Sequence, residues 1–332
     1  MKRQGYLLDQ IADLSNLELA FYKAQKGKSK KASVERYAQD LYANLKQLRG
    51  QILSGEVEAG GYHFFIVYDP KKRQICAAPF EQRVLHHALM NVCHPFFEKW
   101  QINDSYASRL GKGTYAALEK AKTYTRNYAW YLKLDVRKYF DSIDHAVLRS
   151  QLCRMFKDAS LLGIFDRIIS SYEAAPYCGV PIGNLTSQYF ANHYLTSADH
   201  YAKEKLKVPA YVRYMDDMVL WHSDKPALIE AGHQYAEYLK CSLNLELKPF
   251  CLNRNDRGLP FLGYLLYPGQ TLLAQRSRKR YIQKMVLYRS FLKSGTWTQR
   301  DYQRHVLPLT AFTWHAEAKG FRAKVNQHRE IE

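Results

Sequence analysis

The chain has 332 residues, 47% of them hydrophobic and 14% aromatic, which excludes a disordered protein and predicts one large domain or two to three small ones. Its 49 Lys and Arg against 31 Asp and Glu give a net charge of +18, which suits a polyanionic partner, although a ribosome-associated protein has the same excess. The six cysteines form no CxxC pair, which argues against zinc and predicts reduced thiols in a cytoplasmic protein. The sequence has no signal-peptide core and no apolar run of the roughly 18 residues in a membrane span, so we expect no membrane partner.

The N-terminal part is predicted to be helical. Apolar residues recur at helical spacing over residues 6–25 and again over about 34–53. The basic run Lys26–Lys31 between them is either a solvated face or an RNA contact.

A β-hairpin is expected next, from strand-like residues 63–68 and 75–78 around an Asp-Pro turn. The cations near its tip either clamp phosphates or keep a sheet edge soluble, and they are Lys71, Lys72 and Arg73.

Two glycine-bearing loops each precede a predicted helix. Beyond a helix over residues 81–100, the loop 106–114 leads into a helix at 116–123, and Arg109 in this loop could meet an anion near the helix N-terminus. The loop 179–188 opens a second helix, whose start can host an anion or a flat base. An ordinary capped helix after a loop explains this second pattern equally well.

Two predicted sheet segments carry aspartates at their ends. Residues 130–136 alternate as a strand, with Lys133 and Asp135 on one face. A carboxylate at the end of an apolar strand is costly unless it is exposed, paired or metal-bound. Residues 212–221 form two apolar runs around Asp216 and Asp217, which is typical of a hairpin with an acidic bend. By itself this bend is most simply an exposed turn.

The remaining elements are predicted as a helix over 227–239, a strand over 243–250 that ends near Lys248, and a strand pair over 259–267. Asp144 is the expected N-cap of a helix that follows it. Beyond residue 270 the chain is helical and basic, with 13 Lys and Arg against 4 Asp and Glu, so half the net charge lies in this segment. Basic residues interleaved with aromatics suit a nucleic-acid backbone.

Asp135, Asp216 and Asp217 could converge on one sheet edge. Such a cluster binds two Mg²⁺ ions roughly 3.5–4 Å apart for in-line phosphoryl transfer. One ion would activate a 3′-hydroxyl and the other would neutralise the triphosphate. The cluster in a basic protein therefore predicts a nucleotidyltransferase that acts on nucleic acid.

The order of these motifs resembles reverse transcriptase. Tyr214-Met215-Asp216-Asp217 lies between apolar runs, and Leu134-Asp135-Val136 leads to the aromatic pair Tyr139-Phe140. The resemblance implies an α+β right-hand polymerase, with an N-terminal helical extension (1–59), fingers (60–127 with part of 148–178), a palm (128–268) and a short basic helical thumb (269–332). It also implies an RNA-directed DNA polymerase that uses two Mg²⁺ ions, for which Mn²⁺ could substitute, and whose partners are template RNA, cDNA and dNTPs.

The resemblance also implies site roles. Asp135, Asp216, Asp217 and the Val136 carbonyl would bind metal, and Phe140 would exclude a 2′-hydroxyl. Nucleotide contacts would come from Arg73, Arg109, Ile182, Gly183, Gln188 and Lys248, with Lys248 as a proton donor to pyrophosphate and Gln188 on the template side. The primer grip would be Phe261, Leu262, Gly263 and Tyr264, and nucleic-acid contacts in the thumb would be Arg276, Arg278, Lys279, Arg280 and Lys284.

One departure from the intron-type sequence pattern indicates which subfamily of reverse transcriptases the chain resembles. Intron-type reverse transcriptases carry Pro-Gln-Gly and then Ser-Pro in this palm motif, whereas this chain has Pro181-Ile182-Gly183 and then Ser187-Gln188. The pattern is similar to the reverse transcriptases of diversity-generating retroelements, bacterial or phage enzymes of mutagenic retrohoming. These enzymes copy a template-repeat RNA with errors at adenines, together with an oligomeric accessory variability determinant protein. The compact length without a maturase or endonuclease extension fits this subfamily.

Ile182 offers a physical hypothesis for such errors. A glutamine there could hydrogen-bond the incoming nucleotide, whereas isoleucine cannot, and loss of a polar contact weakens discrimination. The alternative is that Ile182 only packs the palm. Two other functions stay open: a reverse transcriptase of a retron or phage-defence system, and a non-catalytic RNA-binding protein with a polymerase-like fold.

Overall fold

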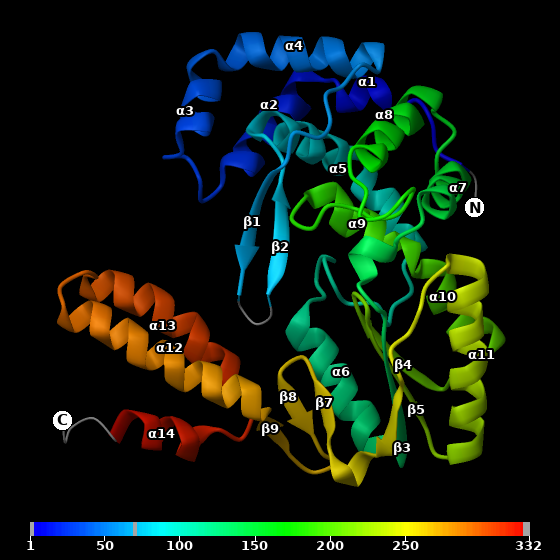
Figure 1. Cartoon of the computed structure of the whole chain (residues 1–332), viewed down its shortest axis with the longest axis vertical. Helices are drawn as coiled ribbons and strands as arrows, with labels where there is room; N and C mark the ends of the chain where they lie inside the picture. Colours follow the sequence, from blue (N-terminus) through cyan, green and yellow to red (C-terminus); the bar gives the residue numbers. More distant parts are fainter. Residues whose placement is uncertain (1–2, 69–71, 328–332) are drawn as a thin grey trace.

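A four-stranded antiparallel sheet with the order β4-β5-β3-β6 forms the centre of the computed structural model, which describes residues 3–68 and 72–327. Its strands are β3 (Trp130–Asp135), β4 (Ala210–Tyr214), β5 (Asp217–His222) and β6 (Cys251–Arg254). Alternate residues of the strands enter two different hydrophobic clusters, so both faces of the sheet are buried. Helix α11 (Lys225–Leu243) contacts β3 and β5, while α6 (Thr114–Asn127) contacts β4 (Figure 1).

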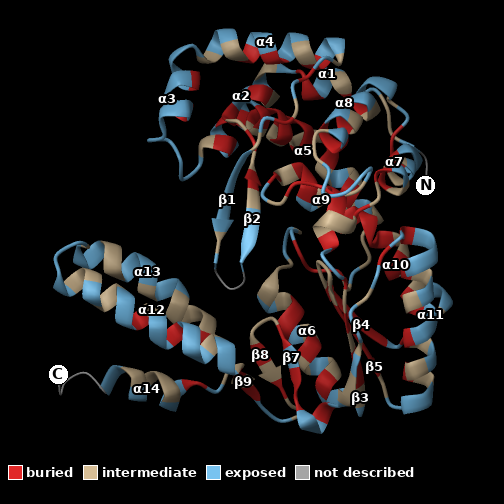
Figure 2. Cartoon of the chain, in the orientation of Figure 1, coloured by how far each residue is buried: buried red, intermediate tan, exposed pale blue. Residues whose placement is uncertain are grey.

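The helical part of the molecule is built around α5 (Phe80–Trp100), against which α1, α2, α3 and α9 pack. Figure 2 shows that buried residues follow α5, α9 and the sheet. The other helices here are α1 (Leu8–Ile11), α2 (Leu14–Gln25), α3 (Ala32–Gln39), α4 (Leu41–Ser54), α7 (His145–Met155), α8 (Ala159–Ser170), α9 (Leu185–Tyr194) and α10 (Thr196–His200).

The two predicted N-terminal helices are each divided in two. Asp13 ends the first piece and caps α2 by accepting hydrogen bonds from the Ser15 and Asn16 amides. Asp40 separates α3 from α4. The predicted hairpin is confirmed as β1 (His63–Val67) and β2 (Arg73–Ala77), and Lys71 lies outside the described residues.

A three-stranded sheet of β7 (Leu259–Phe261), β8 (Tyr264–Leu266) and β9 (Thr271–Leu273) joins the central sheet to the C-terminal helices. Helices α12 (Gln275–Lys293) and α13 (Gln299–Thr313) pack on each other and project away from the rest of the molecule, with α14 (Lys319–Gln327) after them (Figure 1). The described part of the chain contains no helix that is both long and apolar enough to cross a membrane.

The predicted α+β class with antiparallel sheets is confirmed. The predicted strand over 243–250 is wrong, because α11 runs to Leu243 and the following segment pairs only once, through the bridge Val136–Leu247. The alternation there reflects a buried Leu245 on an extended segment. Helix α6, which lies in the range predicted as fingers, packs on β4 and β8.

Candidate active site

The central sheet brings three carboxylates to one end. β3 pairs with β5 so that Asp135 lies opposite Asp217, and β4 pairs with β5 so that Tyr214 also lies opposite Asp217. Asp216 occupies the bend after Met215, whose φ of 55° is in the left-handed region. The strand register thus gathers the three aspartates that the sequence singles out.

The aspartates influence one another electrostatically. Burial raises the pKa of Asp216, and the Asp135 charge raises it further, while Arg73 and Lys248 oppose the shift. Burial, together with the charges of Asp216 and Asp135, raises the pKa of Asp217 to about 6 against the opposing effect of Lys133. The end of the sheet is therefore an electrostatically strained group of acids that a cation would relieve.

Two lysines are bound to these acids. Lys248 Nζ lies 2.7 Å from Asp135 Oδ2, and the Lys248 amide donates to the Asp135 carbonyl at 2.9 Å. Lys133 Nζ lies 3.2 Å from the Asp217 carboxylate and donates to the Pro260 carbonyl at 2.8 Å. Lys133 was not among the predicted site residues, although its place two residues before Asp135 on the same face of β3 was a usable signal.

The donor set fits a divalent cation in its chemistry. Mg²⁺ prefers carboxylate and carbonyl oxygens. Asp217 Oδ1 is buried and lies 3.2 Å from Lys133 Nζ, but it accepts no hydrogen bond of good geometry from the described residues. Across residues 3–68 and 72–327, no three His, Cys, Asp or Glu side chains are grouped closely enough to enclose a metal ion, and two of the three aspartates are bound to the lysines.

Other predicted residues surround the carboxylates. Arg73 on β2 is exposed and close enough to Asp216 to lower the pKa of that carboxyl. Phe140 is half-buried in the short helix after β3, and its carbonyl accepts the Val180 amide at 2.9 Å, which ties it to the loop before α9. Val136 is buried at the end of β3.

The loop before α9 places its predicted residues beside β2. The Ile182 carbonyl accepts the Cys76 amide at 2.7 Å. Gly183 has a φ of +120°, and a Cβ there would lie 2.8 Å from Ile75 Cγ2. This glycine therefore allows the loop to approach β2, a reason that the sequence does not reveal. Gln188 is exposed on α9, 3.5 Å from the Ser108 hydroxyl.

Arg109 does not fit its predicted role. Its guanidinium donates to Glu98 at 2.6 Å and 2.9 Å and to the carbonyls of Ile102 and Ser105, and its side chain is only 7% exposed. Four of its five N–H groups are engaged in this way. The guanidinium therefore braces the loop after α5, which leaves little of it to grip a triphosphate.

The predicted primer grip is the bend between β7 and β8. Phe261 and Tyr264 are buried partners across it, and the Gly263 carbonyl accepts the Ser277 hydroxyl at 2.7 Å. This contact anchors α12 to the bend. Among the predicted thumb contacts, the exposed ones are Arg276, Arg278, Lys279 and Arg280, whereas Lys284 is half-buried.

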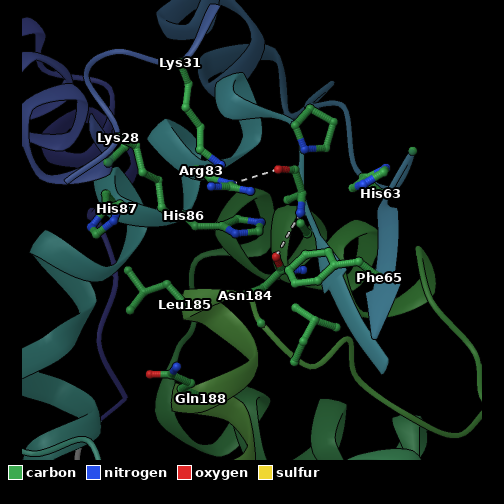
Figure 3. A pocket seen from close by; sticks show the side chains of 17 residues that line it. Lys28, Lys31, His63, Phe65, Arg83, His86, His87, Asn184, Leu185 and Gln188 are labelled. Atoms are coloured by element: carbon green, nitrogen blue, oxygen red, sulfur yellow. Dashed lines mark hydrogen bonds between the residues drawn. The ribbon is translucent and has the colours of Figure 1, made fainter. Parts of the chain in front are cut away.

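A basic cleft of about 490 Å³, not recognised in the sequence, lies beside the start of α9 (Figure 3). Its cations are Lys28 and Lys31, from the turn between α2 and α3, and Arg83 on α5, and its lining residues, all in the described ranges, include no Asp or Glu. Burial and the charges of Arg83 and Lys31 lower the pKa of Lys28, while burial lowers the pKa of His86 to about 3. Gly183 and Gln188 also line the cleft, so it adjoins the loop before α9.

Sequence comparison finds relatives of this chain among known proteins. Protein YkfC of Escherichia coli (strain K12) is 24% identical over 332 aligned residues, covering 84% of this chain and 82% of that protein. Nuclear intron maturase 1, mitochondrial, of Arabidopsis thaliana is 29% identical over 87 residues, covering 26% of this chain and 12% of the maturase.

Two solved telomerase structures show a weaker likeness. Apo telomerase from Candida tropicalis, truncated from its C-terminal domain, has a TM-score of 0.48 at 11% identity, covering 64% of this chain and 55% of that chain. Telomerase from Candida albicans, in complex with a fragment of telomeric RNA, has a TM-score of 0.49 at 13% identity, covering 72% of this chain and 52% of that chain. This chain therefore spans about half the length of those telomerase chains.

The family comparison is decisive, because residues 69–265, more than half of the chain, match the model of the family described as reverse transcriptase (RNA-dependent DNA polymerase). The prediction of a polymerase of this kind is confirmed at the level of the family. The chain belongs to the reverse transcriptase family.

Proposed function

We propose that this protein is an RNA-directed DNA polymerase that extends a DNA primer on an RNA template. The observation that carries the proposal is the register that places Asp135 opposite Asp217, with Asp216 in the adjoining bend. Burial and neighbouring acid charge raise the pKa of Asp216 and of Asp217, and carboxylates perturbed in this way are typical of functional sites.

The proposed cofactor is a pair of Mg²⁺ ions, which Mn²⁺ could replace, held by Asp135, the Val136 carbonyl, Asp216 and Asp217. When bound, the ions would supply positive charge for activation of the 3′-hydroxyl and for neutralisation of the triphosphate. Lys248 holds a proton at Nζ next to Asp135, where it could serve the leaving pyrophosphate.

Nucleotide and template are proposed to lie on either side of the loop before α9. Arg73 would bind the triphosphate, Ile182 and Gly183 would border the nucleotide, and Phe140 would exclude the 2′-hydroxyl. The unpaired template would pass Gln188 into the basic cleft, whose lysines and Arg83 meet no lining acid among the described residues. The primer strand would lie against the bend at Gly263 and the basic face of α12.

Primer extension tests the proposal. Wild type, Asp216→Asn and Asp217→Asn would be incubated with a primed RNA template, dNTPs and Mg²⁺, with Asp166→Asn on α8 as a control for loss of one negative charge. Synthesis by wild type and Asp166→Asn alone supports the mechanism. Synthesis that survives both active-site substitutions removes it, and RNA binding without synthesis by the wild type would indicate the non-catalytic alternative.

We further propose that the enzyme serves a diversity-generating retroelement, copying a template-repeat RNA with errors at adenines alongside an accessory variability determinant protein. Ile182, Ser187 and Gln188 support this assignment. The Ile182 carbonyl is bonded to the Cys76 amide of β2, the strand that also carries Arg73. The test is cDNA synthesis on a candidate template repeat with and without the accessory protein, followed by sequencing. Faithful copying of adenines under both conditions would favour the retron or phage-defence alternative.

A further inference from the structure

Arg213 is the only arginine or lysine among the described residues whose side chain is wholly buried, and it lies on β4 two positions before the bend. Its guanidinium forms a bidentate pair with Asp199 on α10, at 2.7 Å from Nε to Oδ1 and 2.6 Å from Nη2 to Oδ2. Asp199 is equally inaccessible and also accepts the Tyr211 hydroxyl at 2.7 Å. A buried pair of this quality is not required for stability, since apolar residues of similar volume often serve as well.

The rest of the guanidinium reaches toward the active site. Nη1 donates to the Asn192 side chain at 2.9 Å and to the Met215 carbonyl at 3.2 Å. Nη2 also donates to Gln101, Ser105 and the Asn192 carbonyl. All the N–H groups of this side chain therefore find acceptors on several separate segments of the chain.

The bond to Met215 is the contact that matters for chemistry. The Met215 carbonyl belongs to the peptide that continues into Asp216, so its direction fixes the direction of the next residue. Met215 has a φ of 55°, which a residue with a long side chain adopts at a cost. A donor that holds this carbonyl offsets that cost and keeps the bend in one conformation.

The bond to Asn192 connects the same arginine to α9. Asn192 lies one turn after Gln188 on this helix, and its own amide donates to the Ala107 carbonyl at 2.8 Å. Arg213 thus joins the bend that carries Asp216 to the helix that borders the proposed nucleotide and template sites.

We propose that Arg213 is a positioning residue, which orients the Asp216 carboxylate by holding the Met215 carbonyl and sets it relative to α9. The catalytic part of this inference rests on the proposed polymerase function. Lysine has the charge to pair with Asp199 but only one nitrogen, so Arg213→Lys cannot reach Asp199, Asn192 and Met215 together.

The test compares Arg213→Lys with a control, Tyr235→Phe, which loses bonds to Tyr211 and Met218 in the same buried network but does not touch the bend. We expect Arg213→Lys to lower kcat on the order of tenfold to a hundredfold with little change in the KM for dNTPs, because carboxylate orientation acts in the transition state. Hydrogen exchange should become faster at residues 214–217 and stay unchanged in the rest of β5, which begins at Asp217. Tyr235→Phe should change neither quantity.

A second variant keeps the test decisive if Arg213→Lys does not fold. Arg213→Leu/Asp199→Leu removes both charges together and leaves no unpaired ion, so it should fold and yet show the same exchange and kcat changes. Unchanged exchange at 214–217 in the folded variant overturns the proposal. If the variant exchanges faster there but the wild-type protein synthesises no DNA, the role of Arg213 in positioning the bend is supported. The polymerase function is then the part that is contradicted.

Discussion

Lys133 and Asp217 lie on the same face of neighbouring strands, with the lysine Nζ 3.2 Å from the carboxylate. The same nitrogen donates to the Pro260 carbonyl, next to Phe261 of the primer-grip bend. One side chain therefore connects the acid most shifted in pKa with the segment proposed to hold the primer. The Lys133 charge also lowers the pKa of Asp217, which burial raises, so more of the carboxylate is ionised than burial alone would allow.

Lys133→Met should make the enzyme depend on alkaline pH. Without the ammonium, the pKa of Asp217 rises further above about 6, so less of the carboxylate is ionised at neutral pH. We expect the extension rate at pH 7 to fall about tenfold and to recover in part toward pH 9. A pH–rate profile measures this, with Lys122→Met on α6 as a control for loss of a lysine. Parallel profiles for wild type and Lys133→Met would contradict it.

Asp217→Asn should stabilise the protein in the absence of metal. The pKa of Asp217 is raised from 3.8 to about 6 in the folded state, so between these values the folded state binds more protons than the unfolded state and stability falls as pH rises. Asparagine does not ionise, so the variant does not lose stability in this way as the pH rises. The variant should gain on the order of 2 kcal/mol over wild type by pH 7, and the gain should vanish near pH 4. Urea unfolding at both pH values checks this, and an equal difference at both would contradict the assignment.

The strands that carry the candidate catalytic residues can be predicted from the sequence more reliably than the tertiary contacts between them. Alternation places Lys133 and Asp135 on one face, and the apolar runs around Asp216 and Asp217 predict a hairpin, which the structure contains. Strand order is a tertiary property, so only the structure shows that β5 lies between β3 and β4. Arg109 shows a prediction from local sequence that a tertiary contact displaces. Its place in a glycine-bearing loop predicts an anion ligand, but its guanidinium is paired with Glu98 near the end of the preceding helix α5.

The basic cleft was missed for a similar reason. The run Lys26–Lys31 resembles any solvated turn in sequence. What makes two of its lysines notable is Arg83, more than 50 residues further along the chain, which α5 brings to the same cleft. Long-range packing of this kind leaves no local pattern in the sequence.

Phe140→Ala should admit ribonucleotides. The Phe140 carbonyl is bonded to the Val180 amide in the loop before α9, and in the proposed role the Phe140 ring would clash with a 2′-hydroxyl. Truncation to Ala removes the steric barrier and should raise the efficiency of rNTP use relative to dNTP use about tenfold or more. Single-nucleotide extension with each substrate measures the ratio, and Phe250→Ala serves as a control for loss of a half-buried ring. Continued rejection of rNTPs would remove this role.

Ile182→Gln should change misincorporation opposite template adenine. The Ile182 carbonyl is anchored to β2, so the loop should keep its place while the new amide gains a hydrogen-bonding group toward the nucleotide. We expect fewer errors at adenines and unchanged errors at the other bases, measured by sequencing cDNA. Ile182→Leu, which stays apolar, is the matched control. An error spectrum that the glutamine leaves unaltered would mean that Ile182 only packs the palm.

The basic cleft should contribute to template affinity through charge. Lys28 and Lys31 line it, whereas Lys26 and Lys30 of the same turn do not. If each lysine in the cleft neutralises one phosphate, Lys28→Gln/Lys31→Gln should reduce the slope of log affinity against log salt by about 1.4 for single-stranded RNA, since each contact contributes about 0.7. Lys26→Gln/Lys30→Gln has the same net charge and should keep a slope close to that of the wild type. Fluorescence anisotropy over a range of salt concentrations distinguishes the two, and equal slopes would place the template elsewhere.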